Sequence, residues 1–173
     1  MHLVMSQAAE RGARVIAGAA LALAGLVAVP SCTVPSRQEP GQATAAVRDA
    51  VAQATSAVET TRLTLRLFDD DRIPSTVADT ALLDQLRVLD EASTALTTLV
   101  PPDDASAAHR AASADAVDGA VTSVVDARAW VAREAGGNLS ADGGVPTSYD
   151  ELASDLTDVA DGLGQAYAEA GGQ

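Results

Sequence analysis

Residues 82–100 read LLDQLRVLDEASTALTTLV, and the spacing of their apolar side chains decides the fold of this chain. Its main apolar row consists of Leu82, Leu86, Leu89, Ser93, Leu96 and Val100, at alternating intervals of four and three residues. An α-helix turns once in about 3.6 residues, so this spacing places the row on one helix face. The stretch therefore predicts an amphipathic helix whose leucine face must be covered by other parts of the protein.

Three further segments have the same spacing, one before this stretch and two after it. The first row consists of Val47, Val51, Ala54, Val58, Thr61, Leu65 and Phe68. The third row consists of Ala114, Val117, Val121, Val124 and Val131, and Arg128 interrupts it. The last row consists of Leu152, Leu156, Val159, Leu163, Ala166 and Ala170. No alternation of apolar and polar residues long enough for a β-sheet occurs.

Turn and capping residues set the boundaries of the first two helices. Asp69–Asp71 end the first helix, because Pro74 follows shortly after them and proline disfavours helix in the residue before it. Thr76, with Asp79 three residues on, has the pattern of a capping box and predicts the start of the second helix. Pro101-Pro102 end that helix.

The last two helices have boundary signals of the same kind. Asp103 or Asp104 caps the third helix, and Gly136-Gly137 close it, as glycines after a helix commonly do. Two overlapping caps can begin the last helix, Thr147 with Asp150 and Ser148 with Glu151.

These four segments predict an all-α fold, an antiparallel four-helix bundle of up-down-up-down topology over residues 43–173. Each helix has one apolar stripe and must bury it against the others, and the short connections favour antiparallel neighbours. The rows are rich in alanine and valine, so we expect closely spaced helices around a narrow core. The third helix, which contains Arg128 in its row, is expected to be the weakest partner.

Residues 1–31 have the pattern of a secretory signal peptide. Arg11 and Arg14 precede residues 15–29, all of which are apolar or glycine, and Ser31 is a small residue before the expected cleavage point. The apolar run is shorter than the roughly 20 residues that a transmembrane helix needs.

The only cysteine of the chain, Cys32, follows directly in the stretch VPSC. This stretch resembles the lipobox of bacterial lipoproteins, with Val29 at the aliphatic position, Ser31 before the cut and Cys32 at the acylated position, although Pro30 stands where the family prefers a small residue. The resemblance implies cleavage before Cys32 and acyl chains such as palmitate on it. A free cysteine after an ordinary cleavage site and an uncleaved anchor are the alternatives.

The anchor implied by this resemblance places the protein on the extracytoplasmic face of the cell membrane. Two or three acyl chains give a stable anchor, because each buried CH₂ group contributes about 0.8 kcal/mol. Residues 33–42, TVPSRQEPGQ, then predict a flexible tether, so that residues 32–42 link the lipid to the bundle. The signal-like residues and the general character of the chain together resemble those of small helical lipoproteins of high-GC Gram-positive bacteria. This resemblance implies no particular activity.

The charge of the chain excludes several classes of partner. The formal net charge is −13, and no lysine occurs anywhere in the sequence. Nucleic-acid binding relies on clustered lysine and arginine, so no nucleic acid is expected as a partner. Anionic lipid headgroups should also repel the domain.

Residue types typical of active sites are scarce. His109 is the only histidine after residue 31, so neither the inward Glu-x-x-His pairs of di-iron bundles nor a structural zinc site is expected. We expect no cofactor, no metal centre and no enzyme activity. Asp69, Asp70 and Asp71 form the densest acidic cluster, which is interpreted either as a solvated turn or as a weak cation site, since hard cations bind oxygen ligands.

Two residues of the third helix are candidates for partner binding. Trp130, the lone tryptophan, falls beside the buried stripe, where it would anchor a partner or cover the bundle end as part of the structure. Arg128 would either pair with an acid such as Asp84 or Asp155 at a site, or extend its charged group to water.

The hypothesis that follows is a membrane-tethered, non-enzymatic lipoprotein whose acidic bundle binds another envelope protein. Exposed acidic faces would select a basic partner. The alternative is an extracytoplasmic protein that binds a small ligand or a cation.

Overall fold

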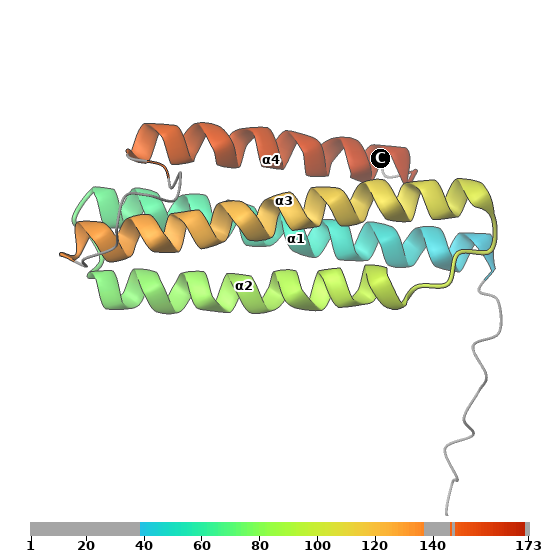
Figure 1. Cartoon of the computed structure of the whole chain (residues 1–173), viewed down its shortest axis with the longest axis horizontal. Coiled ribbons are helices and arrows are strands. Elements are labelled where there is room, and N and C mark those ends of the chain that lie inside the picture. Colours follow the sequence, from blue (N-terminus) through green and yellow to red (C-terminus); the bar gives the residue numbers. More distant parts are fainter. Residues whose placement is uncertain (1–38, 137–145, 147, 172–173) are drawn as a thin grey trace, which may run out of the picture. The chain divides into compact units, whose positions relative to one another are not determined.

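The computed structural model describes residues 39–136, 146 and 148–171, and this part of the chain forms four α-helices. They are α1 (Pro40–Asp69), α2 (Ser75–Thr98), α3 (Asp104–Glu134) and α4 (Tyr149–Glu169). Successive helices run in opposite directions side by side (Figure 1). The predicted antiparallel four-helix bundle is therefore confirmed. The predicted signal peptide, Cys32 and most of the tether lie outside the described residues.

The bundle begins three residues earlier than predicted. Pro40, Gly41 and Gln42, assigned to the tether from the sequence, form the first turn of α1. Proline is favoured at the first helical position, because its fixed φ suits a helix and its missing N–H would have no partner there. Glu39 precedes the helix in an extended conformation, and its side chain makes no capping hydrogen bond. The tether prediction for residues 40–42 is therefore wrong.

The start of α2 also differs from the prediction. α2 begins at Ser75 after Pro74, and no side chain caps its first turn. The capping box predicted for Thr76 and Asp79 is therefore wrong. Pro74 itself takes the extended conformation of an N-cap residue (ψ 156), so the proline sets the helix start without a side-chain cap. Asp79 lies one turn into the helix, where its carboxylate pairs with Arg128 of α3.

α2 ends at Thr98, before the prolines. Leu99 is extended (ψ 129), and the next residue, Val100, directly precedes Pro101, which disfavours the helical conformation there. The helical spacing consequently ends before Val100, whose side chain is 47 % exposed, while Leu99 is buried. The prediction that Val100 belongs to the buried row is wrong for this reason.

Side chains cap α3 and α4 as the sequence predicted. The Asp103 carboxylate accepts a hydrogen bond of 2.7 Å from the backbone N–H of Ser106, and this bond holds the pKa of Asp103 below its usual value. The Ser148 hydroxyl oxygen accepts a hydrogen bond of 3.3 Å from the backbone N–H of Glu151. The alternative cap, Thr147, lies outside the described residues. Each cap satisfies a backbone donor that has no partner within its helix.

The four helices contribute side chains of different size to the core. The fully buried leucines of α2 and α4 are Leu82, Leu89, Leu96, Leu152, Leu156 and Leu163. The buried alanines and serines of α1 and α3 are Ala43, Ala50, Ala54, Ala57, Ser113, Ala120, Ser123 and Ala127. α1 and α3 pack against each other across the bundle, whereas α2 and α4 make no close backbone contact.

α3 is not the weakest partner that the sequence suggested, since it packs against all three other helices. Its buried face is rotated from the predicted row, so that Ala114 and Val121 lie on its half-buried flank. The helix ends with Gly136 in the left-handed region (φ 87), as predicted, and Gly137 lies outside the described residues. Among the described helices, none combines the length and the apolar character needed to cross a membrane.

Leu82 and Leu83 provide a direct test of this burial pattern. The Leu82 side chain is fully buried, whereas its neighbour Leu83 is 39 % exposed. Leu82→Ala should lower the free energy of unfolding by about 2–5 kcal/mol, because it leaves a cavity, and Leu83→Ala by about 1 kcal/mol or less. Urea unfolding followed by circular dichroism measures both, and helix propensity changes equally in the two variants. Equal losses would contradict the orientation of α2.

Candidate functional site

The acidic run Asp69–Asp71 forms the turn that closes α1. Asp71 takes the left-handed conformation (φ 55). Its backbone N–H donates a hydrogen bond to the carbonyl of Phe68, and the backbone N–H of Arg72 donates one to the carbonyl of Leu67. This is the hydrogen-bond pattern of a Schellman helix end, in which an aspartate replaces the usual glycine. Within the described residues no three Asp, Glu, His or Cys side chains could hold a metal ion together.

The interpretation of this run as a weak cation site therefore has no convergent set of ligands among the described residues to support it, and it stays a prediction. All three aspartates are exposed, as the solvated-turn interpretation expected.

An open hollow of about 570 Å³ lies beside this turn, where α1 ends, α2 begins and α3 ends. We call it the end hollow. Its lining includes the apolar side chains of Phe68, Ile73, Pro74 and Trp130 and the charged side chains of Asp69, Asp71, Arg72 and Glu134. The sequence did not indicate it, because its residues come from positions far apart along the chain.

Trp130 is part of the core and only 4 % exposed. Its ring packs edge-on against Phe68, with the ring centroids 5.5 Å apart, and lies 6.3 Å from the ring of Tyr149. A buried indole can offer a partner only the small surface that it presents to the end hollow, so partner binding through Trp130 stays a prediction. The alternative interpretation, a structural residue at the bundle end, agrees with these contacts.

Arg128 links α3 to α2 through a partner that the sequence did not single out. Its Nε donates to Oδ1 of Asp79 at 2.6 Å, and both side chains are about two-fifths exposed. The predicted partners, Asp84 and Asp155, are wrong, because Arg128 pairs with Asp79 instead, and Asp84 pairs with Arg87 at 3.0 Å along α2. An exposed pair of this kind contributes about 1 kcal/mol or less to stability.

Asp126 on α3 and Asp155 on α4 are two negative charges that interact across the contact of these helices, and the sequence analysis did not predict this pair. Partial burial on α3 raises the pKa of Asp126, and the negative charge of Asp155 on α4 raises it further. Both effects disfavour the charged form of Asp126. Apolar periodicity does not detect such a pair, because the contact joins two helices.

Comparison of the chain with models of protein families, with curated proteins and with solved structures finds no match. The chemistry of its surfaces must therefore be argued from its own residues.

The raised pKa of Asp126 gives a stability prediction with a definite sign. A group whose pKa is higher in the folded state stabilises the fold while it is protonated, and this contribution is lost as the pH rises through the folded pKa. Asp126→Asn should therefore raise the free energy of unfolding at pH 7, by less than about 1 kcal/mol since solvent screens the pair. The gain should shrink near and below about pH 4, where the aspartate of the parent is protonated as well.

Urea unfolding at both pH values measures the difference. Asp118→Asn, at an exposed position of the same helix, is the matched control for removing one negative charge. An Asp126→Asn variant no more stable than this control at pH 7 would show that Asp155 and burial do not disfavour the charge.

Proposed function

We propose that this protein is a non-enzymatic lipoprotein, anchored through acyl chains on Cys32 outside the cytoplasmic membrane, whose acidic helical bundle binds another envelope protein. The anchor rests on the signal-like residues 1–31 and on the likeness of VPSC to a lipobox. The binding role rests on the surface of the bundle, and above all on its charge.

The uncompensated negative charge of the bundle is the observation that favours a protein partner. After residue 31 the chain has 23 aspartates and glutamates against nine arginines. Three ion pairs join side chains within the described residues, and each includes one acid. A surface with so many more carboxylates than guanidinium groups attracts a basic surface and repels anionic ones, which is how charged interfaces select their partners.

The alternative, a small-ligand protein, has one observation in its favour, the end hollow. Sites for small ligands usually bury about 70–90 % of the ligand, which requires an enclosing cavity. The end hollow is open to solvent and the core beneath it is filled by side chains. These features favour a surface that receives part of a larger partner.

The absence of lysine from the sequence makes crosslinking unusually informative. A carbodiimide joins carboxylates to amines, and this chain offers many carboxylates but no side-chain amine. An amide crosslink from its aspartates or glutamates should therefore lead to a lysine of another protein. We expect carbodiimide treatment of cells that hold the native protein to yield a discrete crosslinked band containing one lysine-rich envelope protein. A complete lack of such products would contradict the proposed function.

Cys32→Ala tests the anchor separately. The variant should lose label from radioactive palmitate and move from the membrane fraction to the medium, because the acyl chains are lost. Ser36→Ala, four residues further on, should remain in the membrane fraction. Membrane retention of Cys32→Ala would contradict lipid anchoring.

A further inference from the structure

The end hollow combines an apolar floor with a negatively charged rim. Phe68, Ile73 and Trp130 contribute apolar surface to it, and Asp69, Asp71 and Glu134 contribute carboxylates. None of these carboxylates makes a hydrogen bond or ion pair with a side chain in the described part of the chain. The rim is therefore free to pair with a group from outside.

The helix ends around the hollow increase this negative potential. α1 and α3 run in the same direction, so both C-termini, with their partial negative charges, lie at this end of the bundle (Figure 1). Carboxylates beside a helix C-terminus are unfavourable, and here they accompany both ends. A bound cation would relieve this repulsion.

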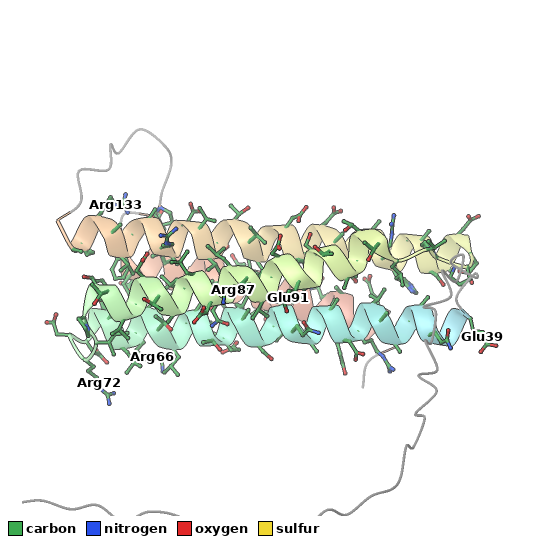
Figure 2. The ribbon with its side chains drawn as sticks, turned by 90° about the horizontal axis from the view of Figure 1, so that it is seen from below. Glu39, Arg66, Arg72, Arg87, Glu91 and Arg133 are labelled. Carbon is green, nitrogen blue, oxygen red and sulfur yellow. The ribbon has the colours of Figure 1, made fainter. Side chains whose placement is uncertain are left out.

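Opposing charges among the residues that line the hollow are fewer. The start of α2 adds partial positive charge, and Arg72 is the one arginine in the lining. Arg72 is exposed and extends outward from the turn (Figure 2). Arg133 lies at the same end, but it donates a hydrogen bond to the carbonyl of Pro146. The starts of α2 and α4 offset the two helix C-termini at this end, but the one arginine of the lining does not balance its three carboxylates.

We propose that the end hollow receives a basic side chain, an arginine in preference to a lysine, from the protein partner. This inference rests on the proposed function and assigns a site to it. The aliphatic part of the arginine packs on the apolar floor, and its guanidinium pairs with the rim carboxylates. Arginine is preferred because its planar group can bind a carboxylate through two hydrogen bonds. The openness of the hollow suits a side chain that remains attached to a larger molecule.

Trp130 makes this proposal measurable, since it is the only tryptophan and lines the hollow. The probe is the peptide acetyl-Gly-Arg-Gly-Arg-Gly-amide, titrated at low ionic strength while tryptophan fluorescence is followed. Its control is the same peptide with citrulline, a neutral isostere, in place of arginine. We expect a saturable fluorescence change with the arginine peptide and none with the citrulline peptide. No change with either peptide would overturn the proposal.

Two triple variants separate the hollow from general charge attraction. Asp69→Asn/Asp71→Asn/Glu134→Gln removes the rim, and it should weaken peptide binding about tenfold. Asp158→Asn/Asp161→Asn/Glu169→Gln removes the same charge from exposed positions of α4, and it should weaken binding about twofold or less, through screened long-range attraction alone. Equal weakening in both variants would overturn the proposal. Neither variant removes a core contact, and loss of the rim charges should slightly stabilise α1 and α3.

The peptide titration and the crosslinking experiment distinguish this inference from the proposed function. A carbodiimide couples carboxylates to amines but not to a guanidinium, so crosslinks to a partner test the proposed function alone. A crosslinked partner together with no specific binding of the arginine peptide would overturn the assignment to the end hollow and leave the proposed function standing.

Discussion

The packing of α1 and α3 against each other across the bundle is the constraint on which the arrangement of the other two helices depends. Both helices contribute fully buried alanines to the core, such as Ala54 on α1 and Ala120 on α3, and small side chains let packed backbones approach closely. The leucines of α2 and α4 then pack on either side of this contact. Because α1 and α3 are parallel, the same contact brings two helix C-termini to one end, where the end hollow carries its negative charge.

Apolar spacing was sufficient to predict four helices and their order, because each leucine-rich or valine-rich row can be buried only on one helix face. Local backbone rules decided the boundaries. Pro40 suits a first helical turn, so α1 began before the predicted tether ended. Leu99 became extended before two prolines, so Val100 left its row. Both rules could be read from the sequence. At the start of α1 the proline rule competed with the tether-like composition of residues 33–42, and at the end of α2 it competed with the apolar spacing that included Val100.

The rotation of α3 was the main error, and it explains the errors at the candidate site. Alanine and serine give a weak periodic signal, so Val121 and Ala114 were placed on the buried row although Ala120, Ala127 and Trp130 occupy it. With the correct rotation, Trp130 is a core residue and Arg128 faces Asp79, 49 residues away. The end hollow and the Asp126–Asp155 repulsion join several helices, so neither follows from one segment alone.

The most direct test of the central contact is to enlarge its small side chains and measure the free energy of unfolding. Ala54→Leu in α1 and Ala120→Leu in α3 should each lower it by about 1–3 kcal/mol, because a larger side chain forces the two backbones apart. The same change at exposed positions of these helices, Ala52→Leu and Ala112→Leu, should have little effect. If the buried and exposed variants were equally stable, α1 and α3 would not be in close contact, and the account of the bundle would be wrong.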